Sequence, residues 1–282
     1  MVSETLAGVR RRAPLPVWLA TKDTYRHLRR YRWPYFWQIV LWALIFWIAQ
    51  ILASIVTAFM SPQGRAIFIV HIGTTIACLL AGGGAAFLSC GRAIMFDRKV
   101  RASDALRLHW PGAFWRTLAL YWLIVHLVPT VGAHELRDYA NVNEVSWPGY
   151  DLILAGYWAW TLLTAPLLVL ALPIAAFEPQ TSPIREAWTR LRGNRVRMAL
   201  LALAAAAPVV AIQLFYDHGR AGIPDMLSEQ GRPGMMTFLE FFMLQPARGA
   251  LSFLLILVLG AAVMSAYMRL SPRFEHVARV FD

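Results

Sequence analysis

The sequence predicts an all-α protein: an integral membrane bundle of six transmembrane helices, arranged as three helical hairpins, with short amphipathic interfacial helices on the cytoplasmic side. Composition is the first observation behind this fold class, because 58% of the 282 residues are hydrophobic and only 15% are charged, whereas a soluble domain carries about 25% charged residues. The second is a set of six continuous apolar stretches, each long enough for a membrane-spanning helix. The third is a strong asymmetry of Lys and Arg along the chain.

The same composition excludes other classes of protein. Abundant apolar residues exclude a disordered chain. Only two cysteines are present, Cys78 and Cys90, both within one apolar stretch, which excludes a disulfide scaffold. The apolar stretches are continuous and do not alternate at every second residue, which disfavours a β-barrel. What remains is a helical membrane protein.

The predicted spans contain no Asp, Glu, Lys or Arg, and they are Phe36–Met60, Ala66–Cys90, Thr117–Ala133, Leu152–Phe177, Met198–Tyr216 and Ala250–Met268. A helix needs about 20 residues to cross the hydrocarbon core, and the third span is the shortest. A basic cytoplasmic or interfacial segment at residues 1–33 precedes the six-span domain at residues 34–270. A short cytoplasmic tail at residues 271–282 follows it.

Orientation follows from the basic residues in the flanks and loops, because Lys and Arg are enriched on the cytoplasmic side of membrane proteins. With six spans both termini lie on one side, and 22 of the 27 basic residues fall there. The acidic residues divide evenly between the two sides. Both termini are therefore expected to be cytoplasmic. The net charge of +11 is explained largely by this topology, so membrane lipids and not nucleic acid are the expected partners.

A loose internal repeat supports the three hairpins. The segment Trp33–Trp37 recurs as Trp110–Trp115, which gives a period of about 80 residues. Each unit then consists of a basic surface segment, a span outward, an external loop and a span back.

The clearest amphipathic segment runs from Ser182 to Gly193. Ser182 suits a helix N-cap, Pro183 the first helical position and Gly193 the residue beyond the end. Weaker candidates are Ser103–Trp110 and residues 17–32. Such helices set topology and anchor the spans, or they recognise lipid. The residues expected at the lipid headgroups are Arg185, Trp188, Arg190, Arg192 and Arg195.

The string SPIREAWTRLRGNRVR at residues 182–197 follows a Pro-rich span end at Pro173–Pro179. It resembles the segment that joins two spans in the polytopic membrane domain found beside glycerophosphodiester phosphodiesterases, and in the stand-alone bacterial relatives of that domain, whose function is unknown. The resemblance is strongest over residues 150–215. It implies a multi-pass protein of the bacterial cytoplasmic (inner) membrane. It does not imply catalysis, since the phosphodiesterase domain needs a soluble barrel with metal-binding carboxylates, for which this chain has no room.

Sequence motifs of catalysis are not found. The chain has no Gly-rich phosphate loop, no Gly-x-Ser-x-Gly elbow and no Cys pair at metal-ligand spacing. Acidic residues avoid the spans, whereas an ion-coupled transporter usually places a carboxylate there. We therefore expect no enzymatic activity and no catalytic residue. Glu178, at the cytoplasmic end of the fourth span, is expected to pair with a nearby arginine.

Two histidines are candidate cofactor ligands. His71 and His126 both fall in the outer half of the membrane in the predicted topology, where facing imidazoles could bind haem b or a metal. The alternative is that each imidazole hydrogen-bonds to a neighbouring helix or to interfacial water, and no cofactor is required by the sequence.

Small residues recur every fourth position through the second span, and they are Gly73, Ala77, Ala81, Ala85 and Ser89. A face of this kind lets another helix approach closely. It serves either packing within the bundle or formation of a homo-oligomer.

Taken together, these patterns favour a non-catalytic scaffold, accessory or assembly subunit that packs against membrane proteins or lipids. A passive transporter or channel for a small or amphipathic solute is the alternative, for which a polar path lined by Thr74, Thr75, Gln213 and the histidines is expected. A haem- or metal-binding redox subunit using His71 and His126 is the third hypothesis. An enzyme acting on lipid headgroups is the fourth, and it has no candidate acid–base pair.

Overall fold

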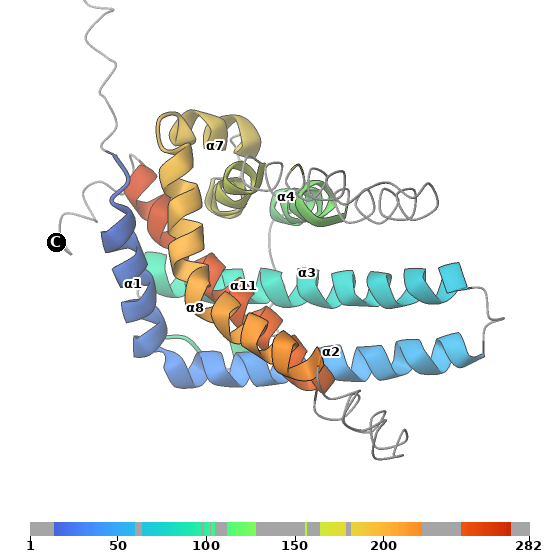
Figure 1. Ribbon diagram of the computed structural model, residues 1–282. Helices are drawn as coiled ribbons and strands as arrows, with labels where there is room; N and C mark the ends of the chain where they lie inside the picture. Colours follow the sequence, from blue (N-terminus) through green and yellow to red (C-terminus); the bar gives the residue numbers. More distant parts are fainter. Residues whose placement is uncertain are drawn as a thin grey trace, which may run out of the picture.

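A computed structural model describes residues 14–59, 64–96, 99–101, 103–104, 112–127, 156, 164–178, 182–221 and 244–271. Within these ranges every regular element is a helix, so the all-α prediction is confirmed (Figure 1). The helices are α1 (Val17–Arg30), α2 (Arg32–Ala58), α3 (Gly64–Phe96), α4 (Gly112–Trp122), the π-helical turn η2 (Leu123–Leu127), a helix over Thr164–Phe177, α7 (Pro183–Leu191), α8 (Arg195–Ala221) and α11 (Gln245–Leu270).

Four of these helices are long and apolar enough to cross a bilayer, and their spans are Arg32–Thr57, Gly73–Met95, Arg195–Tyr216 and Gln245–Leu270. Helices suit this environment because they satisfy every backbone polar group internally. The chain is therefore a membrane-embedded helical protein. The third and fourth predicted spans are described in part, as the shorter apolar helices Gly112–Val125 and Thr164–Phe177. Their other ends, at residues 128–133 and 152–163, lie almost wholly outside the described residues.

The helices extend beyond the apolar stretches that predicted them. Helix α3 continues past Cys90 to Phe96, and α8 begins at Arg195, three residues before the predicted span. Backbone hydrogen bonding continues through the charged flanks, because long Arg side chains place their charge at the interface while their stems stay with the helix. Hydropathy therefore located the apolar part of each helix and not its ends.

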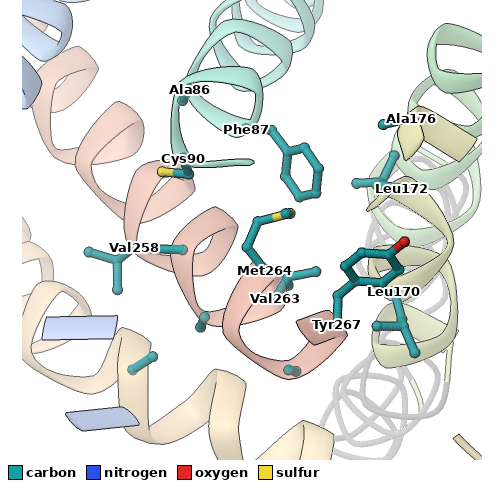
Figure 2. Packing of buried hydrophobic residues seen from close by; sticks show 14 of the residues in the cluster. Ala86, Phe87, Cys90, Leu170, Leu172, Ala176, Val258, Val263, Met264 and Tyr267 are labelled. Atoms are coloured by element: carbon teal, nitrogen blue, oxygen red, sulfur yellow. The ribbon is translucent and has the colours of Figure 1, made fainter. Parts of the chain in front are cut away.

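Helix α11 lies at the centre of the bundle. In its most apolar stretch 61% of the residues are buried, against 22% for α2 and for α8. Figure 2 shows side chains from α3, α11 and the helix Thr164–Phe177 converging in one apolar cluster, in which Phe87, Leu172 and Met264 meet. The two peripheral helices thus expose most of their apolar surface outside this core.

Glycines on α3 allow rings from neighbouring helices to approach its backbone. A Cβ atom at Gly84 would lie 2.8 Å from the indole of Trp115, and one at Gly91 would lie 2.9 Å from the ring of Phe177. Real Cβ atoms do not tolerate such contacts, so these positions need glycine for packing. The helix stays continuous through them.

Helix α1 lies across the ends of α8 and α11 (Figure 1). The Asp23 carboxylate accepts a hydrogen bond from Arg269 Nη2 at 2.6 Å, and the Tyr25 hydroxyl donates to the Ala205 carbonyl at 2.6 Å. Just before the helix, Leu15 N donates to Asn194 Oδ1 at 2.9 Å. The predicted helix at residues 17–32 is thus present, and it is anchored to the last two long helices.

Helix α7 confirms the amphipathic helix predicted after Ser182. Pro183 begins the helix, and Gly193 beyond its end has φ of +81°, a conformation that favours glycine. Ser182 occupies the N-cap position, but its side chain makes no capping hydrogen bond. Of the weaker segment Ser103–Trp110, only the turn at 103–104 is described.

Candidate functional site

A buried ion pair marks the end of the bundle where the helix Thr164–Phe177 stops. Glu178 is 8% exposed and Arg190 is 3% exposed. Arg190 donates to both oxygens of the Glu178 carboxylate, from Nη1 at 2.9 Å and from Nη2 at 2.7 Å. This bidentate geometry is the strong form of an arginine–carboxylate pair. It joins α7 directly to the end of the preceding apolar helix.

Other side chains complete the cluster around this pair. Arg190 Nε donates to Glu186 Oε1 at 2.9 Å, and Nη1 also lies 3.4 Å from Ser271 Oγ. The Tyr267 hydroxyl donates to Glu178 Oε1 at 2.6 Å. The guanidinium carbon of Arg190 lies 5.6 Å from the centre of the Tyr267 ring. The cluster therefore connects α7, α11 and the helix Thr164–Phe177.

The arrangement keeps both charges in place. Burial alone would lower the pKa of Arg190, but the hydrogen bonds to Glu178 and Glu186 raise that pKa above its ordinary value. The charges neutralise each other inside the protein, and the hydrogen bonds fix their geometry. A cluster of this kind holds helices in one arrangement, and removal of either partner would leave an uncompensated buried charge.

Of two expectations from the sequence, the structure confirms one and shows that the other is wrong. The pairing of Glu178 with an arginine is confirmed, and the partner is Arg190. Arg190 itself was assigned to the lipid headgroups, but it lies inside the bundle. Ala187, Arg190 and Leu191 are the buried residues of α7, because positions i, i+3 and i+4 share one helix face.

The remaining residues assigned to the headgroups lie on the outside of the bundle. Arg185, Arg192 and Arg195 are exposed, and Trp188 is 52% exposed. The Arg195 guanidinium lies over the Trp188 indole at 3.6 Å, which is a cation–π contact. Basic and aromatic groups thus share one exposed surface around α7.

His71 is engaged with the neighbouring helix α2. Its Nδ1 atom lies 3.0 Å from Gln50 Oε1, and Gln50 Nε2 donates to the Thr75 hydroxyl at 2.8 Å. Thr75 in turn donates to the His71 carbonyl at 2.8 Å. The expected hydrogen bond from this imidazole to a neighbouring helix is present. With Nδ1 used in this way, Nε2 is the His71 atom that would have to ligate a cofactor.

His126 lies in η2, and its side chain is outside the described part of the structure. The structure therefore does not relate the imidazoles of His71 and His126. Among the described residues, no group of three or more His, Cys, Asp or Glu side chains could hold a metal ion together.

The small-residue face of α3 changes character along the helix. Ala85 and Ser89 are buried against α2, where Gln38 Nε2 donates to Ser89 Oγ at 2.9 Å. Ala81 is partly buried, whereas Gly73 and Ala77 are exposed. The part of the face toward the C-terminal end of α3 thus packs inside the bundle, and the part that contains Gly73 and Ala77 remains accessible.

A histidine that the sequence analysis did not single out lies between α1 and α2. His27 Nε2 lies 2.7 Å from the Tyr35 hydroxyl. Burial, together with the smaller effect of the nearby Arg30 charge, lowers the pKa of His27 to about 4. The imidazole is therefore neutral at pH 7, and Nε2 shares a hydrogen bond with the Tyr35 hydroxyl.

An apolar cavity of about 240 Å³ opens between α3, α4, α8, α11 and the helix Thr164–Phe177. Phe87, Trp122 and Leu255 contribute to its lining, together with the polar residues Gln213 and Ser252. A predominantly apolar lining with a few polar groups is typical of sites for lipid tails and other hydrophobic ligands.

In comparisons with known proteins, no protein-family model, curated protein or solved structure matches the chain.

Proposed function

We propose that the protein is a non-catalytic membrane scaffold or accessory subunit that packs against membrane proteins or lipids. The observation that carries this proposal is that polar side chains hold the helices together, whereas much of the apolar surface lies outside the core. The pairs Gln50–Thr75, Gln38–Ser89 and Glu178–Arg190 hold helices of the bundle to one another. The peripheral helices α2 and α8, in contrast, leave most of their apolar residues outside the core. A rigid body with broad apolar flanks suits assembly better than chemistry.

A stripe on α2 is the best candidate contact surface. Leu44, Ile48, Leu52 and Ile55 are 44–56% exposed, and their spacing of three or four residues places them on one helix face. On α8, Val210 and Leu214 are exposed in the same way. Surfaces of this kind face lipid tails or another membrane helix.

The proposal includes six spans with both termini in the cytoplasm. In support, helix ends rich in basic residues come together at one end of the bundle. Asp23 pairs with Arg269, Leu15 with Asn194, and Gln38 with the carbonyl of Arg101. The resemblance of residues 182–197 to the phosphodiesterase-associated membrane domain adds a bacterial inner membrane to the proposal.

The test is purification in native lipid, followed by quantitative mass spectrometry of the particle. We expect a protein or a lipid at a fixed stoichiometry. Two paired variants then locate the surface: Ile48→Ala with Leu52→Ala on α2, and Val210→Ala with Leu214→Ala on α8. Loss of the partner from one pair only, with an unchanged melting temperature, supports a specific contact. A lone particle without stoichiometric protein or lipid would contradict the proposal.

A passive transporter for an amphipathic solute is the second candidate, because Gln213 places one polar side chain in the apolar cavity of the bundle. Its test is solute flux into liposomes, with Gln213→Leu as the variant and Leu214→Ala as the control. Flux that Gln213→Leu alone reduces would favour transport over the scaffold. The absorption spectrum of the same preparation tests the redox hypothesis, since a Soret band lost in His71→Leu would indicate haem.

A further inference from the structure

A second and more polar cavity lies at the C-terminal end of α3. Its volume is about 390 Å³, and it is lined by Ser89, Arg92, Ala93, Lys99, Val100, Arg101 and Asp104. Ligand pockets measure about 300–1,000 Å³, so the space accommodates a small polar group. The sequence pattern assigned Ser89 to helix packing and the basic residues of this cavity to membrane topology, and it did not predict a binding site here.

The cavity carries an excess of positive charge. Arg92, Lys99 and Arg101 line it, and within the described residues none of the three makes an ion pair. Among the described lining residues Asp104 is the one carboxylate, and its Oδ2 accepts the backbone N–H of Arg101 at 2.9 Å. Three cationic side chains gathered around one hollow attract a multivalent anion, and phosphate matches the guanidinium geometry.

The wall of the cavity is fixed by a buried amide. Gln38 is 3% exposed, and its Nε2 donates to Ser89 Oγ at 2.9 Å and to the Arg101 carbonyl at 2.8 Å. These bonds hold the segment around Arg101 against α2 and α3. Because Ser89 Oγ accepts a hydrogen bond from Gln38, its own O–H is left to donate to a ligand. The site thus combines three cationic side chains with a buried neutral donor.

The cavity also lies at the depth of lipid headgroups. Gln38 belongs to the first turns of α2, where Trp33 and Trp37 are 63% and 57% exposed. Exposed tryptophans mark the boundary between hydrocarbon and water in membrane proteins. A cationic hollow at this level meets the phosphates of the adjacent leaflet, and it is open to soluble phosphate as well.

We propose that this cavity binds a phosphate-bearing group through Arg92, Lys99 and Arg101, with the Ser89 hydroxyl as a further donor. This proposal deepens the proposed function, because it names the lipid chemistry that the scaffold would hold. It rests on the proposed function for a lipid as the source of the phosphate. The phosphate belongs either to an anionic phospholipid headgroup or to a soluble phosphate compound.

The experiment uses the full chain and two probes. Phosphatidylglycerol is titrated against the detergent-purified protein by native mass spectrometry, and inorganic phosphate is titrated by thermal shift. The test variant is Arg92→Gln with Lys99→Gln and Arg101→Gln. The control is Arg116→Gln with Arg197→Gln and Arg248→Gln, which removes the same charge from exposed positions outside the amphipathic segments. The variant Ser89→Ala tests the neutral donor separately.

We expect the cavity variant to weaken binding by about tenfold or more, since each bond to a charged group contributes substantially, while the control stays within about twofold of the native protein. Loss of binding in both probes identifies the phosphate group itself as the ligand; loss of phosphatidylglycerol binding alone identifies a lipid headgroup. Equal losses in the cavity and control variants, or no binding of either probe, would overturn the proposal. Purification in native lipid tests the scaffold role separately, because a protein partner can be absent while the cavity still binds phosphate.

Discussion

Arg185 and Arg190 lie on the same short helix and have opposite surroundings. Arg185 is exposed, whereas Arg190 is buried and bound to two carboxylates. The difference follows from helix periodicity, because Arg190 shares its face with the buried Ala187 and Leu191. At the scale of single residues, therefore, position on a helix face and not residue type determines whether an arginine is exposed or stabilises the bundle.

We predict that Arg190→Met destabilises the protein by about 3–5 kcal/mol, because Glu178 is left as an uncompensated buried charge. Replacing both partners, with Glu178→Leu and Arg190→Met, should recover most of that loss, since no unpaired charge remains. Denaturant unfolding of the purified protein measures both changes. Arg185→Ala is the control and should change the free energy of unfolding by less than about 0.5 kcal/mol. Equal effects of the single and double variants would contradict a role for the ion pair.

His27 provides a prediction on pH dependence. Its pKa is about 4 in the folded protein and 6.5 in its ordinary environment, so the unfolded chain binds the proton more tightly. The contribution of His27 to stability is complete above pH 6.5 and is lost as the pH falls toward 4. The loss is on the order of 2–3 kcal/mol.

The measurement is the pH dependence of the unfolding free energy in the native protein and in His27→Gln. The variant should show a shallower decrease between pH 6.5 and pH 4, because Gln does not titrate. Parallel curves for the two proteins would mean that His27 keeps its ordinary pKa after folding.

At the scale of elements, α3 is closely packed at one end and open at the other. Residues from Gly82 to Gly91 are all buried, whereas Gly73 and Ala77 are exposed. The buried glycines lie against the rings of Trp115, Phe177 and Phe253. One helix thus combines an internal packing surface with a face available to a partner.

We predict that Gly84→Val destabilises the bundle by about 1–3 kcal/mol through overpacking against Trp115. The matched control is Gly73→Ala, because a Cβ atom there meets nothing within 4 Å among the described residues. This change should be neutral or stabilising by up to about 1 kcal/mol, since alanine favours the helix. Thermal unfolding of both variants in the same detergent compares them. Similar losses at the two positions would show that helix propensity and not ring contact determines the need for glycine.

At the scale of the whole molecule, the sequence predicted the helices well and their lateral contacts poorly. Hydropathy located α2, α3, α8 and α11 because apolar runs are a one-dimensional property of the chain. The bond between Gln38 and Ser89, and the position of Arg190, depend on which faces meet after packing. No local pattern encodes that choice, and only Glu178, a carboxylate at a span end, gave a signal of the buried cluster.

At the scale of the whole molecule, we predict that both termini of the chain lie in the cytoplasm. Fluorescent protein and alkaline phosphatase are fused in turn after Asp282, and each is inserted between residues 62 and 63, which join the first two predicted spans. We expect fluorescence and no phosphatase activity at the C-terminus, with the reverse at the insertion, because the predicted six-span topology places 22 of 27 basic residues on the side of the termini. Phosphatase activity at Asp282 would contradict the predicted cytoplasmic position of the C-terminus.

The contacts of α1, and of Leu15 just before it, also impose an order on assembly of the bundle. Its partners Asn194, Ala205 and Arg269 follow it by 179, 180 and 246 positions along the chain. At about 5–20 residues per second, the ribosome needs about 12–50 s to make the last of them after Asp23. During that interval its partner helices are still unmade, and an amphipathic segment such as α1 favours a membrane surface. Helix α1 thus leaves the ribosome before its partner helices, and it can reach its final place only after they are made.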